Sequence, residues 1–165
     1  MFEPTQRAGD QVHEIIQEYS TMVYRLAYAR TGNRADAEDV YQDVFFRLFR
    51  TQPEFENCRH IKAWLIRTTI HTSVNLLRSA WRRHFSSMPE NYDVPAPQID
   101  NQRFEALASA LKRLPEKQRV AIHLYYYEEL STDEIAEILG EKGSTIRSYL
   151  KRGREKLKSL LTEVK

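Results

Sequence analysis

Apolar residues recur at steps of three and four along most of the chain, and this spacing constrains the fold more than any other feature. Such spacing places apolar side chains on one face of an α-helix, whereas the strict alternation of a half-buried β-strand is scarce. Helices are predicted near residues 12–30, 35–50, 61–83, 104–114, 116–127, 131–139 and 144–161. Thr31, Gly32 and Asn33 end the first of them. The sequence therefore predicts an all-α protein.

One stretch without helical period divides the chain. Residues 86–100 contain Pro89, Pro95 and Pro97 among polar residues, and proline makes a linker semi-rigid. Apolar residues sufficient for a small core lie on each side, and 165 residues can form two small domains. We therefore expect helical domains over residues 1–85 and 104–165, joined by a proline-containing linker over residues 86–103. An ordered loop within one domain is the alternative.

Composition argues against several classes of protein. No run approaches the roughly 18 apolar residues of a membrane-spanning helix, and the N-terminus lacks the pattern of a signal peptide. We therefore expect a cytoplasmic protein without membrane insertion. Cys58 is the only cysteine, which excludes an internal disulfide and a multi-cysteine zinc site. The five histidines are scattered, and no phosphate-binding glycine loop or H-E-x-x-H motif occurs. No metal, cofactor, catalytic residue or enzymatic activity is expected.

Charge is distributed unevenly, although the net charge is only +2. No Asp or Glu occurs between Asn57 and Pro89, and residues 141–165 contain eight Lys or Arg against three acids. Clustered cations are typical of proteins that bind a polyanion such as nucleic acid. Solvated helix faces give the same pattern, so charge alone leaves both interpretations open.

A helix-turn-helix pattern lies in the second basic segment. Ser131 and Glu134 form a capping box, Gly140 fits the left-handed residue that ends a helix, and a basic helix follows. In this motif the second helix enters the major groove, where early side chains contact bases and nearby cations contact phosphates. Arg147 can form two hydrogen bonds to guanine, and Arg154 suits a phosphate. The candidate DNA-binding residues are Ser144, Thr145, Arg147, Ser148, Lys151 and Arg152. An ordinary helical hairpin with a basic surface is the alternative.

Two sets of motifs resemble the sigma factors of bacterial RNA polymerase. Residues 114–119 (LPEKQR), 130–140 and 143–148 are similar to sigma region 4. Residues 36–45 (DAEDVYQDVF) resemble region 2.2, and residues 63–67 (AWLIR) resemble the start of the long basic helix in the same domain. Regions 2 and 4 separated by a short linker are the layout of the extracytoplasmic-function (ECF) group.

The resemblance implies partners and residue roles. In the family, region 2.2 docks on the clamp helices of the polymerase's largest subunit, which implies a docking face of Asp39, Gln42, Asp43 and Phe46. The remainder of region 2 captures the −10 promoter element and holds a melted strand. The corresponding residues are Asn57, Arg59, His60, Lys62, Arg67, His71, Arg78 and Arg82. Region 4 recognises the −35 element. The expected partners are core RNA polymerase, promoter DNA and an anti-sigma factor, because family members are often held inactive by such a protein.

The chain departs from the family pattern at several positions. His71 and Asn75 stand where the family often has Asn and Asp, and Gly153 replaces a common Ala, which is expected to weaken the last helix. Trp64 is expected in the core, together with one or two of residues 125–127, which are all tyrosine.

A dimeric helix-turn-helix regulator that acts without polymerase is the alternative function. It accounts for residues 104–161 but not for the region 2-like segments.

Overall fold

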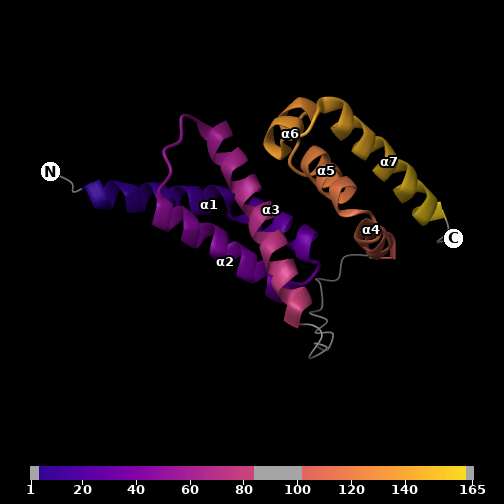
Figure 1. The fold of residues 1–165 in the computed structure, drawn as a ribbon, viewed down its shortest axis with the longest axis horizontal. Helices are drawn as coiled ribbons and strands as arrows, with labels where there is room; N and C mark the ends of the chain where they lie inside the picture. Colours follow the sequence, from indigo (N-terminus) through magenta and orange to yellow (C-terminus); the bar gives the residue numbers. More distant parts are fainter. Residues whose placement is uncertain (1–3, 84–101, 163–165) are drawn as a thin grey trace. The chain divides into compact units, whose positions relative to one another are not determined.

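The computed structural model describes the backbone of residues 4–83 and 102–162 and the side chains of residues 9–78 and 106–162. Seven helices occur in this described part (Figure 1): α1 (Pro4–Thr31), α2 (Arg34–Thr51), α3 (Cys58–Arg83), α4 (Gln102–Lys112), α5 (Glu116–Tyr126), α6 (Thr132–Leu139) and α7 (Gly143–Thr162). The described residues contain no strand, which confirms the all-α prediction. Almost all of the predicted linker lies outside them.

The chain forms two compact units, Met1–Arg78 and Ser79–Lys165. Helices α1, α2 and most of α3 belong to the first unit, and α4 to α7 belong to the second. The expected architecture of two small helical domains is therefore confirmed. The boundaries at residues 85 and 104 remain predictions, because the division between the units falls within the last turns of α3.

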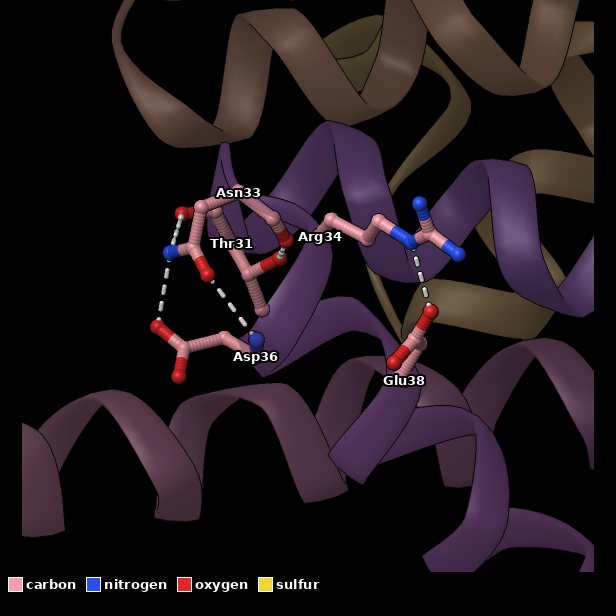
Figure 2. Close-up of polar contacts among 5 residues, drawn as sticks. All are labelled: Thr31, Asn33, Arg34, Asp36 and Glu38. Carbon is pink, nitrogen blue, oxygen red and sulfur yellow. Dashed lines mark hydrogen bonds and ion pairs between the residues drawn. The ribbon is translucent and has the colours of Figure 1, made fainter. Parts of the chain in front are cut away.

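A short turn joins α1 to α2 and directs the two helices against each other. Gly32 adopts a φ of 78°, a left-handed conformation that glycine adopts without steric cost. Asn33 Oδ1 accepts a hydrogen bond from the Asp36 amide at 2.9 Å, and Asn33 Nδ2 donates to Asp36 Oδ2 at 2.8 Å (Figure 2). Arg34 pairs with Glu38 one turn later, with 2.7 Å between Nε and Oε1 (Figure 2). The Asn33 cap thus satisfies a free backbone amide at the start of α2.

The core of the first unit lies between α1 and α2, which pack along each other. Its fully buried side chains include Val23, Leu26, Val40, Val44 and Leu48. Each helix thus buries the face that the three- and four-residue spacing predicts. The acidic and aromatic side chains on the opposite side of α2 are left exposed.

Apolar spacing predicts a buried stripe of Ile66, Ile70, Val74, Leu77 and Trp81 on α3, but the helix buries a different face, and Trp81 lies outside the described side chains. Ile66 is buried, but Ile70, Val74 and Leu77 are only half-buried. The rest of the buried face consists of Leu65 and four hydroxyl side chains, Thr68, Thr69, Thr72 and Ser73. The hydroxyls of Thr69 and Ser73 each donate to the carbonyl oxygen four residues earlier, at 2.6 Å. Because these bonds satisfy the hydroxyls of Thr69 and Ser73, the burial of these two groups carries little desolvation cost.

Helix α7 is the centre of the second unit and packs against α4, α5 and α6. Leu124, Ile135, Ile146 and Leu150 are buried at these contacts. Gly153 is also buried, and a Cβ there would collide with Ile122 Cδ1 of α5. The expectation that Gly153 only weakens α7 is therefore incomplete, because its missing side chain permits a close approach of two helices.

The capping pattern around α6 is confirmed. Ser131 Oγ accepts a hydrogen bond from the Glu134 amide at 3.1 Å, and Gly140 ends the helix with a φ of 66°. These two residues fix both ends of an eight-residue helix. They thereby set the turn from which α7 starts.

The expectation for the three consecutive tyrosines is wrong, since Tyr125, Tyr126 and Tyr127 are all exposed. Near this end of α5, His123 is the buried residue instead. Its ring stacks on Tyr127, with ring centroids 5.1 Å apart. His123 Nε2 lies 3.7 Å from Glu128 Oε1. Because α5 ends at Tyr126, the tyrosines lie where the chain leaves the core.

None of the described helices combines the length and the apolar character that crossing a membrane requires.

Candidate nucleic-acid interface

The solvent side of α7 carries the residues predicted to contact duplex DNA. Ile146 and Leu150 are fully buried, which fixes the rotation of the helix. Ser144, Arg147 and Lys151, at i, i+3 and i+7, therefore share one exposed face. The structure brings together on the solvent side all six predicted residues, with Ser144, Arg147, Lys151 and Arg152 exposed and Thr145 and Ser148 half-buried.

The basic face of α7 continues beyond the predicted residues. Arg154 and Lys158 are exposed and follow Arg147 and Lys151 at helical spacing, which gives a stripe of four cations. Arg154 Nη1 donates to the Tyr126 hydroxyl at 3.2 Å. Lys158 was not among the predicted site residues, although its spacing of four from Arg154 could have identified it. A stripe of this kind can neutralise several phosphates.

A second cationic face runs along α3. His60, Arg67, His71 and Arg78 are exposed at steps of four and seven, so they share one side of the helix. Lys62 is half-buried and lies two residues from His60, which places it on the other side of α3. Arg59 is exposed but is offset by about a quarter turn from His60. Of the predicted −10 residues, Arg82 lies outside the described side chains.

The loop before α3 presents hydrogen-bond donors. Asn57 caps the helix, since its Oδ1 accepts a hydrogen bond from the His60 amide at 3.0 Å. The Glu56 amide donates to His60 Nδ1 at 3.3 Å, which places the proton of the neutral ring on Nε2. The side-chain nitrogen Nδ2 of Asn57 and the ring nitrogen Nε2 of His60 are therefore available to donate hydrogen bonds to a ligand.

Aromatic rings support this loop from one side. Phe55 meets His60 edge-on at 5.4 Å and Trp64 at 6.0 Å between ring centroids. Trp64 is half-buried rather than fully buried in the core as expected, because it lies at the edge of the unit against Phe55. Since α3 begins at Cys58, three residues earlier than predicted, Arg59 and His60 belong to its first turn.

The exposed face of α2 brings together the predicted polymerase-contacting residues. Asp39, Gln42 and Asp43 are exposed, and Phe46 exposes 63% of its surface. Phe49, one turn further, exposes 58% and was missed by the sequence reasoning. Its spacing of three from Phe46 could have identified it. Two exposed aromatic rings beside carboxylates form an apolar patch with an acidic border, which is typical of a protein-binding surface.

Comparison with known proteins decides the family. Residues 15–83 match the model of Sigma-70 region 2, and residues 104–157 match that of Sigma-70, region 4. The ECF RNA polymerase sigma-E factor of Haemophilus influenzae is 31% identical over 160 residues, which cover 88% of this chain and 84% of that protein. The chain belongs to the ECF family of RNA polymerase sigma factors.

Further relatives of this sigma factor differ in how much of their own length the chain spans. ECF sigma factor SigE of Mycolicibacterium smegmatis is 36% identical over 94% of the chain, which spans only 65% of that relative's length. SigW of Bacillus subtilis is 27% identical over 96% of the chain and 94% of its own length. The sigma factor RpoE of Bartonella quintana, solved with the anti-sigma factor NepR, superposes with a TM-score of 0.76 at 26% identity, over 91% of this chain and 96% of that one.

The family match also places the three faces of this sigma factor within its regions. The α2 face and the α3 face both fall within the segment that matches region 2, and the first half of α7 falls within region 4. Among the described residues, no three His, Cys, Asp or Glu side chains are grouped as a metal ion would require.

Proposed function

We propose that this sigma factor binds core RNA polymerase and directs promoter-specific initiation, with region 2 engaging and opening the −10 element and region 4 reading the −35 element. The observation that supports the proposal best is the occurrence of three exposed faces in one chain. They are the acidic and aromatic face of α2 and the cationic faces of α3 and α7. A dimeric regulator acting on duplex DNA alone requires only the last of them. In this role the protein has no catalytic chemistry of its own.

The proposed role of the α2 face is to bind the polymerase. Asp39 and Asp43 would pair with cations of a partner helix, and Gln42 would hydrogen-bond at its polar edge. Phe46, with Phe49 beside it, would be buried on docking, and buried aromatic side chains typically contribute most of the affinity of an interface. The charges would mainly govern orientation and the rate of association.

The proposed role of the α3 face is to hold the opened −10 strand. Arg67, Arg78 and Arg82 would follow the phosphates, with His71 between them, and the loop donors of Asn57 and His60 would contact an unstacked base. Cations combined with nearby aromatic rings are the usual means of binding single strands. Arg59 and Lys62 belong to the same proposed site, but they lie on other sides of α3 and would reach neighbouring parts of the DNA.

The proposed role of α7 is to read the −35 duplex. Arg147 would contact a guanine edge in the major groove, with Ser144, Thr145 and Ser148 allowing close approach. Lys151 and Arg152 would contact phosphates, which fixes the register of the helix on the DNA. The proposed domain boundaries are those of the sequence prediction, residues 1–85 and 104–165.

We also propose an anti-sigma factor as a regulatory partner. The RpoE sigma factor that shares this fold was solved as a complex with the anti-sigma factor NepR. A protein that covers the α2 face would prevent polymerase binding without altering either domain. The proposed site of action for this sigma factor is the cytoplasm, where polymerase and DNA are found.

Run-off transcription tests the proposed function. Purified bacterial core polymerase is supplied with host genomic fragments, with and without this protein. Initiation at discrete start sites only when the protein is present is the expected result, and alignment of those sites gives the −10 and −35 sequences. Binding to a symmetric duplex without polymerase, together with no initiation, would instead favour the dimeric regulator.

A pair of substitutions on α7 tests the separation of base and phosphate contacts. Arg147→Ala is expected to weaken −35 binding by about 1–3 kcal/mol and to relax the preference at one base pair. Lys158→Ala is expected to weaken binding to all sequences equally and to lower the salt dependence by about one unit of slope. Both are measured by fluorescence anisotropy on duplex promoter DNA at several salt concentrations. Equal sequence preference in the two variants contradicts the assignment of Arg147.

A further inference from the structure

Two opposite charges flank the space beside Gly143, the first residue of α7. Asp133 Oδ1, in the first turn of α6, and Arg147 Nη1, in α7, both lie 3.4 Å from where a Cβ of Gly143 would stand. Both side chains are exposed. Asp133 is not among the residues proposed to contact DNA, but it stands beside the side chain that is proposed to read a guanine.

The turn between α6 and α7 keeps these two residues close. The backbone amide of Glu141, in that turn, donates to a carbonyl of α6 at 3.0 Å. The Tyr149 hydroxyl of α7 donates to Glu141 Oε1 at 3.3 Å, and Lys117 Nζ of α5 lies 3.6 Å from the same oxygen. Glu141 is thus held by three helices. The backbones that carry Asp133 and Arg147 therefore keep one relative position.

Asp133 and Arg147 form no ion pair with each other, and neither pairs with any other side chain that the structure describes. Water solvates both groups in the free protein, where an exposed ion pair would gain little. Duplex DNA against α7 would remove that water and strengthen the attraction. An arginine that donates to both acceptors of guanine keeps further N–H donors, because a guanidinium carries five. The Asp133 carboxylate is a nearby acceptor for one of them.

We propose that Asp133 is a positioning residue for Arg147 and thereby sets the base preference of α7, an inference that rests on the proposed −35 role of this helix. A guanidinium that donates to Asp133 has fewer orientations, so its other donors stay directed at the base edge. Hydrogen bonds between charged groups are short and directional, which suits this role. A base without the two acceptors of guanine would leave desolvated donors unsatisfied, which is unfavourable.

The same carboxylate opposes binding that is independent of sequence. The stripe of four cations on α7 attracts the phosphates of any duplex. Asp133 lowers the positive potential beside Arg147, the first of these cations. A guanidinium held by Asp133 is also less free to turn toward a phosphate. The pair therefore favours a guanine contact and disfavours general affinity, and specificity is the difference between the two.

A purely structural role of Asp133 makes a different prediction. An acid in the first turn of a helix stabilises that helix through its dipole. Loss of this effect would lower the stability of the second unit, but it would not change the preference at one particular base pair. Base preference and stability are therefore measured separately.

The test uses holoenzyme assembled from the full-length protein and core RNA polymerase. It is bound to a promoter found by run-off transcription and randomised over the −35 element, and the bound DNA is sequenced. Arg147→Ala identifies the base pair that Arg147 reads. Asp133→Asn removes the charge and keeps the shape. Glu155→Gln is the matched control, because it removes one negative charge from an exposed position of α7. Thermal melts compare the stability of all variants.

Asp133→Asn is expected to lower the preference for guanine at the Arg147 base pair by about three- to tenfold and to leave the other −35 positions unchanged. Both Asp133→Asn and Glu155→Gln should raise binding to unrelated sequences, but Glu155→Gln should keep the guanine preference. Asp133→Glu should retain most of it. Adding Asp133→Asn to Arg147→Ala should cause no further loss of preference, because Asp133 acts through Arg147.

Three results would overturn the proposal and leave the proposed function intact. They are an unchanged guanine preference in Asp133→Asn, an equal loss at every −35 position, and a further loss in the double variant. If Arg147→Ala changes the preference at no base pair, the assigned role of Arg147 fails together with this inference. If wild-type holoenzyme shows no base preference in the −35 element, the proposed function of α7 fails as well.

Discussion

At the scale of single residues, Glu129 adopts a backbone conformation that its side chain disfavours. Its φ of 54° lies in the left-handed region, and among the described non-glycine residues only Gln52 shares this property. Glu129 follows α5 and directs the chain so that Leu130 is buried and Ser131 caps α6. The requirement for this turn direction, and not a contact of the carboxylate, explains why the strain is tolerated.

Glu129→Gly is therefore expected to stabilise the second unit. Relief of the left-handed strain, reduced by the larger chain entropy of glycine, gives a net gain of about 0.5–1 kcal/mol. Glu129→Ala removes the same carboxylate but keeps a Cβ, so it should give no comparable gain. Urea denaturation followed by circular dichroism measures both. An equal gain in both variants would show that the carboxylate, and not the backbone, is unfavourable.

Tyr19 is expected to make the first unit sensitive to alkaline pH. Partial burial, the nearby Glu18 carboxylate and a hydrogen bond with Cys58 all raise the pKa of the Tyr19 hydroxyl. The folded state therefore holds this proton more tightly than the unfolded state, so stability is lost as pH rises above about 10, the ordinary tyrosine value. Tyr19→Phe should flatten this decline in thermal melts, and Tyr24→Phe, which leaves Tyr19 in place, should not.

At the scale of the secondary-structure elements, the second unit depends on how closely α7 approaches α5. Gly153 lies against Ile122, and Gln118 is the next neighbour, 3.6 Å from where a Cβ would stand. Because Gly153 has no side chain, α7 can pack closely against α5. This packing fixes the orientation of the basic face of α7. The weaker intrinsic helix propensity of glycine is offset by this contact.

Gly153→Ala is expected to destabilise the second unit by about 1 kcal/mol, since overpacking outweighs the gain in helix propensity. The added Cβ would displace the Ile122 side chain, whose Cδ1 atom occupies that space. Ile122→Val removes this atom, so the double variant should recover part of the loss. A double-mutant cycle of unfolding free energies measures the coupling. Additive effects would show that the two residues do not compete for space.

At the scale of the whole molecule, two compact units carry different proposed contacts on one chain. The α2 and α3 faces belong to the first unit, and the α7 face belongs to the second. Binding of either unit to the polymerase–promoter complex raises the effective concentration of the other. The predicted linker, residues 86–103, is therefore expected to contribute by keeping the −10 and −35 contacts on one chain.

Cleavage within the predicted linker tests this expectation. A protease site placed within residues 86–100 allows the intact protein to be cut after purification. Initiation in run-off transcription should fall at least about tenfold at equal molar concentration, and it should recover as the concentration of both pieces is raised. The uncut protein carrying the site is the control. Undiminished initiation after complete cleavage would show that the connection is dispensable.

Local features of the fold could be predicted from the sequence because they depend on residues within one helical turn. The existence of the helices follows from apolar spacing, and the ends of α6 follow from Ser131 and Gly140. The exposure of Arg147 and Asp43 follows from the burial of their helical neighbours Ile146 and Val44. The sequence by itself thus determined the all-α class, the order of the elements and most of the candidate contact residues.

Other features were decided only by the tertiary structure. The buried face of α3 includes four hydroxyl side chains, two of which bond to carbonyls of their own helix, and hydrophobic spacing alone cannot anticipate this. The exposure of the three tyrosines depends on where α5 ends, and the role of Gly153 depends on Ile122, 31 positions earlier in the chain. A hollow lined by Gln11 and Ile15 of α1, Leu48 of α2 and Phe55 of the following loop likewise requires all three segments. Each of these features arises from contacts between distant segments, and such contacts exist only after the helices have packed.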